Sequence, residues 1–192
     1  MSAFFDRTYL KIPFIEERKL VKAIFVDRDG TMGGSDRIEY PGEFQLYPGV
    51  QAKFREVQEN GTKLFSFTNQ PGIAEGEATM ENFRNELNSF GFDGVYVCPH
   101  TPAAKCKCRK PGTRMIERAC KEHGLRAEDC FVIGDRLTDM LAATRAGCEG
   151  ILVTTGAGEE SLRHWQQSDD QLDIKWIAED IIHALDRLMA GK

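Results

Sequence analysis

The sequence KAIFVDRDGT, residues 22–31, decides how the rest of the chain is interpreted. Its first half is a short apolar run with β-branched and aromatic side chains, which is typical of a buried strand. The run ends abruptly at Asp27, and Asp29 follows two residues later. A strand that ends at two acidic residues predicts a sheet with polar functional side chains at the C-terminal ends of its strands.

The alternation of strand and helix continues toward the C-terminus. Apolar runs predict strands at residues 64–67, 94–97, 131–133 and 151–153, and helical spacing predicts helices at residues 48–60, 79–90, 113–123, 138–146 and 176–188. Short strands that alternate with such helices form right-handed βαβ units. We therefore predict an α/β fold, a Rossmann-like doubly wound parallel sheet, as a single domain at residues 21–192. Residues 1–20 form an N-terminal extension for which the sequence suggests no role.

Composition places the chain among globular proteins. Hydrophobic residues make up 41% of its 192 residues, and 30 Asp and Glu outnumber 25 Lys and Arg to give a net charge of −5. This acidic balance argues against binding to nucleic acid or to an anionic membrane. No apolar run reaches the ~20 residues of a membrane span, and Pro13 with nearby charges interrupts any signal-peptide region. We expect a cytoplasmic protein that is monomeric or weakly self-associating.

Asp27 and Asp29 repel each other unless a cation or a proton intervenes. Hard oxygen ligands suit Mg²⁺, so one interpretation is a divalent metal held by Asp27 and a backbone carbonyl, with Asp29 turned toward a substrate. The alternative is a solvated turn, since Asp and Gly are common turn residues. Taken alone, this segment leaves both interpretations open.

Further polar residues follow the other predicted strands, where a parallel sheet places its functional site. They are Thr68, Asn69 and Gln70 after the second strand, Arg109 and Lys110 in the loop after the third, and Asp135 and Arg136 after the fourth, with Asp139 one helical turn later. Singly, each has an ordinary explanation, such as an Asp that caps a helix. Jointly, their positions favour one site for a phosphoryl group.

A cysteine and histidine cluster lies directly before Arg109. Cys98, His100, Cys106 and Cys108 place three thiols and an imidazole within eleven positions. Such a set suits tetrahedral structural zinc. Reduced thiols or a disulfide in the loop are the alternatives.

Four segments in order, residues 27–31, 68–70, 109–111 and 134–135 with Asp139, resemble the motifs of haloacid-dehalogenase-superfamily phosphatases. The resemblance extends from about residue 23 to about residue 156. Residues 68–74 and 98–111 are most similar to the subgroup with minimal caps that contains heptose-bisphosphate and histidinol-phosphate phosphatases. Residues 32–34 and 111–115 depart from the heptose branch, which affects the substrate assignment but not the chemistry.

The resemblance implies a Mg²⁺-dependent phosphatase. Asp27 would attack phosphorus to form an aspartyl-phosphate, and Asp29 would protonate the leaving group and then activate water. Asp27, the Asp29 carbonyl and Asp135 would hold Mg²⁺. Thr68 and Lys110 would hold the transferring group. Asp139 would orient Lys110 or a metal-bound water, or merely cap its helix.

The resemblance also implies how the substrate is bound. The expected contacts are Thr68, Asn69, Gln70, Arg109, Lys110 and Arg136, and we expect Arg28, Arg109, Lys110 and Arg136 to make the pocket positive. In this subgroup the loop with Cys98, His100, Cys106 and Cys108 carries structural zinc, which would hold Arg109 and Lys110 against the phosphate.

The expected substrate is a small phosphorylated metabolite of carbohydrate metabolism, such as heptose 1,7-bisphosphate, with histidinol phosphate as the alternative. A phospho-accepting receiver module would share the sheet, the Asp, Mg²⁺, Thr and Lys. Asp29 lies two residues after Asp27, which would accept the phosphoryl group. A carboxyl group at this position favours hydrolysis of the phosphorylated protein over its use as a signal. An inactive zinc-stabilised scaffold is disfavoured because the expected catalytic residues are all present.

Overall fold

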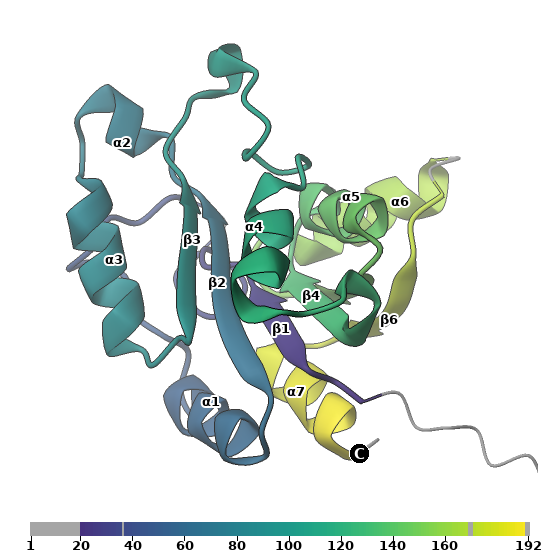
Figure 1. Cartoon of the computed structure of the whole chain (residues 1–192). Helices are drawn as coiled ribbons and strands as arrows, with labels where there is room; N and C mark the ends of the chain where they lie inside the picture. The colour runs from purple at the N-terminus through teal and green to yellow at the C-terminus, as the bar shows by residue number, and fades with distance from the viewer. Residues whose placement is uncertain (1–19, 36, 169–170, 191–192) are drawn as a thin grey trace, which may run out of the picture.

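The computed structural model of the chain describes residues 20–35, 37–168 and 171–190 (Figure 1). Its centre is a six-stranded sheet of order β3-β2-β1-β4-β5-β6 in which all neighbouring strands are parallel. The strands are β1 (Ala23–Val26), β2 (Lys63–Asn69), β3 (Gly94–Cys98), β4 (Cys130–Gly134), β5 (Glu149–Val153) and β6 (Ile174–Ala178). This order is that of a doubly wound sheet, so the predicted fold class is confirmed.

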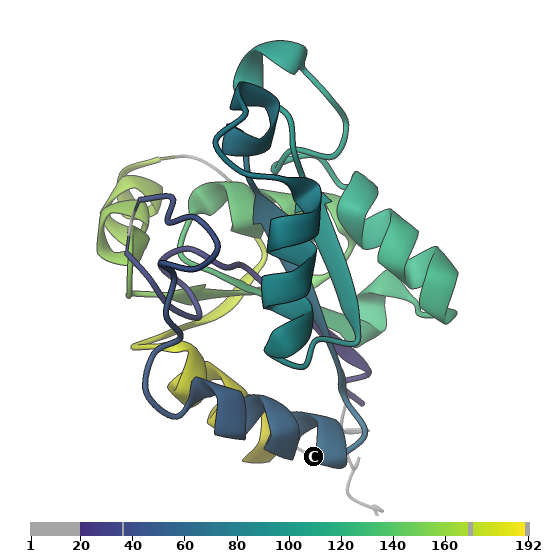
Figure 2. The ribbon, with the colours of Figure 1, turned by 90° about the vertical axis from the view of Figure 1, so that its left-hand side faces the viewer.

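Helices cover both faces of the sheet. They are α1 (Val50–Glu59), α2 (Gly72–Glu75), α3 (Met80–Ser89), α4 (Arg114–His123), α5 (Leu137–Ala146), α6 (Gly158–Gln167) and α7 (Ile181–Ala190), with short 3₁₀ turns at Pro102–Ala104 and Ala127–Asp129. Because strand side chains alternate, Ile24 and Val26 of β1 pack in the core beneath α1, α3 and α7, whereas Phe25 packs with α4 and α5 on the other face. Figure 2 shows α1 and α7 side by side below the sheet.

One predicted element needs correction at the C-terminal end, and one helix there was not predicted. The helix predicted at residues 176–188 is instead strand β6 followed by helix α7. Along β6, exposure alternates between neighbouring residues, and Ile177, which lies within the predicted helix, is 39% exposed. Helix α6 was not predicted, because Gly158 is its only buried residue and no apolar stripe marks it.

The segment between β1 and α1 crosses the carboxyl edge of the sheet as a loop. It includes an isolated bridge between Gly33 and Leu46 and forms no helix or strand of its own in its described part. The site is therefore covered by a local loop, as the expected minimal cap requires. The predicted N-terminal extension lies outside the described residues except for Leu20. In the described part of the chain, no helix has the length and apolar character to cross a membrane.

Candidate active site

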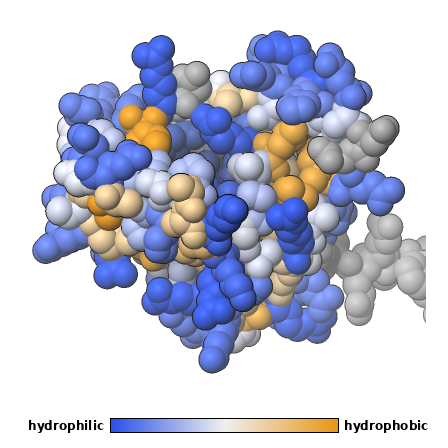
Figure 3. Space-filling model, turned by 90° about the horizontal axis from the view of Figure 1, so that it is seen from above, coloured by the Kyte–Doolittle hydropathy of each residue, from blue (hydrophilic) through white to orange (hydrophobic). Residues whose placement is uncertain are grey.

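A pocket of about 310 Å³ opens at the carboxyl edge of the sheet. Figure 3 views this face from above, where it is mainly hydrophilic. Seven of the residues expected at the site line the pocket: Asp27, Asp29, Thr68, Asn69, Arg109, Lys110 and Arg136. They come from the ends of β1 and β2, the loop after β3 and the start of α5, so the fold brings together segments that lie far apart in the sequence.

Lys110 lies at the base of this pocket between two carboxylates. Its Nζ is 2.8 Å from Asp27 Oδ1 and 2.6 Å from Asp139 Oδ1, and it donates a hydrogen bond of 3.1 Å to the carbonyl of Phe67. Burial lowers the pKa of Lys110, but the adjacent Asp139 and Asp27 carboxylates outweigh this effect and hold the pKa above its ordinary value. The lysine is therefore a fixed positive charge.

Asp135 and Asp139 owe their positions to close backbone packing. A Cβ on Gly134 would lie 2.3 Å from Asp139 Oδ2, so only glycine lets that carboxylate fold back over the strand end. Asp139 Oδ2 accepts a hydrogen bond from Arg136 N at 3.0 Å, and Asp135 Oδ2 accepts one from Ala157 N at 2.7 Å. Asp139 thus contacts Lys110 and caps α5, and its role in orienting Lys110 stays a prediction.

The three carboxylates Asp27, Asp135 and Asp139 form a cluster that suits a divalent cation. One oxygen from each lies within 4.8 Å of the others. Burial, followed by the charge of Asp27, raises the pKa of Asp135 to about 7. Lys110 and the Arg136 amide engage both oxygens of Asp139, whereas Lys110 and the Arg28 amide contact Asp27 only at Oδ1. Asp27 Oδ2 and Asp135 are therefore the hard oxygen donors best placed to hold the cation.

Asp29 stands apart from that cluster. Its Oδ1 is 2.5 Å from Arg28 Nη1, and its Oδ2 accepts a hydrogen bond of 2.6 Å from Gln70 Nε2. Burial raises the pKa of Asp29 to about 6; Arg28 opposes this shift and Asp27 reinforces it. A carboxyl group poised near neutral pH is suited to general acid–base catalysis.

The residues at the end of β2 have distinct surroundings. Thr68 is buried and accepts a hydrogen bond of 2.9 Å from Gln70 Nε2. Asn69 Oδ1 accepts a hydrogen bond of 3.0 Å from the Lys110 amide, which fixes the Lys110 backbone beside β2. Gln70 is fully buried behind Asp29 and Thr68, so it supports the pocket wall and does not line it.

Arg28 does not contribute to the positive pocket, and that expectation is wrong. Its side chain is completely buried, pairs with Glu86 of α3 and stacks 3.8 Å from the ring centroid of Phe44. Arg28 therefore lies behind the pocket wall, where its Nη1 contacts the Asp29 carboxylate.

Sequence reasoning missed three residues of the pocket wall: Arg37, Ile38 and Thr138. Arg37 and Ile38 belong to the loop between β1 and α1, which no motif covers. Ile38 is 40% exposed although it is large and apolar. A long insertion directly after the first catalytic strand is the signal that could have found them.

The thiols and imidazole of the loop after β3 gather as a compact four-atom set. Cys108 Sγ lies 3.4 Å from Cys98 Sγ, 3.4 Å from Cys106 Sγ and 3.3 Å from His100 Nδ1. Tetrahedral zinc with Zn–S bonds of ~2.3 Å separates its sulfurs by ~3.8 Å, so this spacing fits zinc. These cysteines are all free, which excludes the disulfide alternative in this structure.

The same cluster is joined directly to the pocket. The Arg109 amide donates to Cys106 Sγ at 3.4 Å, and Arg109 Nη1 donates to the His100 carbonyl at 3.2 Å. Two hydrogen bonds thus tie the cluster to Arg109, which directly precedes Lys110 in the chain.

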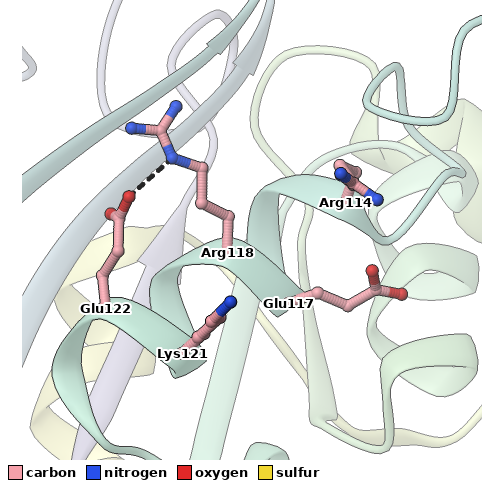
Figure 4. A pocket seen from close by; sticks show the side chains of 5 residues that line it. All are labelled: Arg114, Glu117, Arg118, Lys121 and Glu122. Carbon is pink, nitrogen blue, oxygen red and sulfur yellow. Dashed lines mark hydrogen bonds and ion pairs between the residues drawn. The ribbon is translucent and has the colours of Figure 1, made fainter.

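A larger hollow of about 530 Å³ lies on the outer face of α4 (Figure 4). All five residues that line it, Arg114, Glu117, Arg118, Lys121 and Glu122, belong to this one helix. They carry both signs of charge, and Arg118 Nε pairs with Glu122 Oε1 at 2.7 Å. This hollow is a solvated helix face, not a site for chemistry.

Comparisons with known proteins agree with the geometry of the pocket. A family model described as HAD-hydrolase-like matches residues 107–183. The D-glycero-beta-D-manno-heptose-1,7-bisphosphate 7-phosphatase of Helicobacter pylori strain J99 is 34% identical over 169 residues, which cover 81% of this chain and 97% of that protein. The bifunctional histidine biosynthesis protein HisB of Campylobacter jejuni subsp. doylei is 33% identical over 148 residues, 68% of this chain but 41% of that protein.

A solved structure adds a likeness in three dimensions. The D,D-heptose 1,7-bisphosphate phosphatase from B. bronchiseptica, complexed with magnesium and phosphate, superposes with a TM-score of 0.77 at 27% identity. The match covers 89% of this chain and 99% of the other.

Proposed function

The chain belongs to the HAD-like hydrolase family and is a phosphatase, and from this premise we propose that it removes the phosphate at C7 of D-glycero-D-manno-heptose 1,7-bisphosphate. The observation that carries the proposal is the composition of one pocket. Asp27, Asp29, Thr68 and Lys110 all line the same pocket of about 310 Å³.

Asp27 is the proposed nucleophile. Its carboxylate forms a bond to phosphorus as the bond from phosphorus to the sugar oxygen breaks, which gives an aspartyl-phosphate. Asp29 donates its proton to the leaving oxygen and then takes a proton from the water that attacks this intermediate. Release of inorganic phosphate restores Asp27. Thr68 and Lys110 hold the phosphoryl oxygens, and Lys110 also holds Asp27 in place at 2.8 Å.

We assign the divalent metal to Asp27 and Asp135, with the Asp29 backbone carbonyl as a further ligand. Burial and the charge of Asp27 raise the pKa of Asp135, so its ionised form is unfavourable without a cation. A bound cation would stabilise that ionised form. When bound, Mg²⁺ neutralises charge between the nucleophile and the phosphoryl oxygens. Asp139 remains with Lys110 and orients it.

We assign structural zinc to Cys98, His100, Cys106 and Cys108. The donor set is complete at four, which leaves no open position for chemistry. Its role is to order the loop, and through the two hydrogen bonds of Arg109 it holds that arginine at the pocket.

The charge of the pocket favours a bisphosphate over histidinol phosphate. Arg37, Arg109 and Arg136 line it in addition to Lys110, whose own charge is engaged by Asp27 and Asp139. Three arginines beyond the catalytic lysine suit a second anionic group, whereas the ammonium group of histidinol phosphate would be repelled.

Phosphate release with Mg²⁺ from matched substrates tests the proposal. We expect kcat/KM for the heptose 1,7-bisphosphate to exceed that for histidinol phosphate by about tenfold or more, and Asp27→Asn to abolish both activities. A higher kcat/KM for histidinol phosphate would overturn the substrate assignment. A stable phosphoprotein that releases no phosphate would instead support the receiver-type alternative.

A further inference from the structure

Within the described residues, the mechanism proposed above leaves the buried charge of Arg28 without a role. Arg28 lies next to the nucleophile in sequence, its side chain is 0% exposed, and it does not line the pocket. Burying a guanidinium is costly unless it is paired and hydrogen-bonded. What surrounds Arg28 therefore indicates what it does.

All three guanidinium nitrogens of Arg28 are engaged, and in two directions. Toward the pocket, Nη1 contacts Asp29 Oδ1 at 2.5 Å and donates to the Glu39 carbonyl at 2.7 Å. Toward α3, Nε and Nη2 both donate to Glu86 Oε1, at 2.9 Å and 2.6 Å. The arginine thus joins a helix on one side to the Asp29 carboxyl group on the other.

The position of the guanidinium is fixed by stacking as well as by charge. Its carbon lies 3.8 Å from the ring centroid of Phe44 and 5.2 Å from that of Phe83. Stacked and forked contacts of this kind are specific to arginine and hold its plane in one orientation. Arg28 is therefore a rigid support behind Asp29, not a mobile surface charge.

The Asp29 carboxyl group is held at both oxygens. Arg28 holds Oδ1, and Gln70 Nε2 donates to Oδ2 at 2.6 Å. With each oxygen tied to a different buried group, the carboxyl plane cannot rotate freely. A proton donor must be aligned with the leaving oxygen, and a misplacement of about 1 Å costs on the order of 100-fold in rate.

We propose that Glu86 and Arg28 form a clamp that positions Asp29 for proton transfer, which makes both of them positioning residues of the phosphatase reaction. The proposal rests on the proposed function, in which Asp29 both donates and accepts a proton. Glu86 is needed because its Oε1 accepts the two hydrogen bonds that Arg28 Nε and Nη2 donate. Glu86 gives Arg28 a counter-charge at each stage, so the guanidinium stays in place.

Two kinds of variant test the clamp. Glu86→Gln keeps the size of the side chain but removes its charge, and Glu81→Gln is its control, since Glu81 is exposed on the same helix. The double variant Arg28→Met with Glu86→Leu replaces the buried pair by apolar side chains, an exchange that is often neutral for stability. If a single substitution unfolds the protein, this double variant still tests the clamp.

The readout is the contrast between two leaving groups, assayed with Mg²⁺. The sugar alkoxide of a sugar phosphate needs protonation, whereas p-nitrophenolate leaves without it. We expect the clamp variants to lose about 10- to 100-fold in kcat for the sugar phosphate, with KM within about threefold of the wild-type value. With p-nitrophenyl phosphate they should release one equivalent of nitrophenolate per chain in a burst, then turn over slowly, because hydrolysis of the aspartyl-phosphate still needs Asp29.

A merely structural role predicts other results. Equal losses for both substrates without a burst, unchanged kinetics in Glu86→Gln, or wild-type activity in the folded double variant would each overturn the clamp. Failure of the proposed function looks different: the wild-type protein itself would release no phosphate from either substrate, and the clamp would be overturned with it.

Discussion

Replacing Lys110 with Met is expected to destabilise the fold as well as to abolish activity. The Lys110 side chain is 3% exposed and separates two carboxylates that are themselves nearly buried, Asp27 at 7% and Asp139 at 0% exposure. In the variant these carboxylates face each other without the cation. Phe67 also loses the hydrogen bond that Lys110 Nζ donates to its carbonyl.

The magnitude follows from the cost of leaving a buried charge unpaired. Removing one partner of a buried ion pair costs about 3–5 kcal/mol. With a urea m-value of about 2 kcal/mol/M, the unfolding midpoint should fall by about 1.5–2.5 M at pH 7.5 without added Mg²⁺. Loss of the lysine removes a charge that lowers the pKa of Asp139, so this pKa rises further in the folded state and the loss of stability should shrink as the pH is lowered toward 5.5.

Urea unfolding followed by circular dichroism measures this loss. Lys121→Met, a change at an exposed lysine of α4, is the matched control and should shift the free energy of unfolding by about 0.5 kcal/mol or less. Adding Asp139→Asn to Lys110→Met should recover part of the stability. A loss below about 1 kcal/mol, or one that does not shrink at lower pH, would refute the reasoning.

Three further predictions concern the metal, the loop and the strand end. Burial, followed by the charge of Asp27, raises the pKa of Asp135 to about 7. The protonated form of Asp135 therefore stabilises the metal-free fold below about pH 4, and this stabilisation is lost as the pH rises through about 7. Mg²⁺ binds the ionised form, so the gain in Tm on adding Mg²⁺ should grow from pH 5 to pH 8, and a gain independent of pH would contradict the assignment. Elemental analysis should find about one zinc per chain, and Cys108→Ser should lower both zinc content and kcat; full activity in a zinc-free protein would contradict the proposed role of the loop. Gly134→Ala places a Cβ 2.3 Å from Asp139 Oδ2, and we expect a loss of about 2–4 kcal/mol measured by urea unfolding, whereas a neutral effect would show that Asp139 moves aside at little cost.

The sequence predicts the site best where a polar functional residue lies at the end of a strand. Asp27, Thr68 and Asp135 each follow or end a short buried run, so the parallel sheet alone brings them to one edge. The strand at Ile174–Ala178 was missed because its edge position leaves only one side packed, and Ile177 happened to match a helical repeat.

What the sequence could not show is the direction of side chains around the strand ends. Arg28 and Gln70 are polar neighbours of catalytic residues, and both are buried behind the pocket wall. Arg37 reaches the pocket through a loop whose path depends on tertiary contacts. Residue order predicts which segments meet, but side-chain orientation depends on partners such as Glu86 that lie far away in the sequence.

The central claim is that Asp27 carries the phosphoryl group during turnover. Asp29→Asn slows hydrolysis of the intermediate, so rapid acid quench of this variant with Mg²⁺ and p-nitrophenyl phosphate, followed by peptide mass spectrometry, tests the claim most directly. We predict that the peptide containing residues 22–31 gains the mass of one phosphoryl group, that the group maps to Asp27, and that the gain is absent when Asp27→Asn is added. A phosphoryl group on another residue, or steady turnover by a variant that lacks Asp27, would contradict the account.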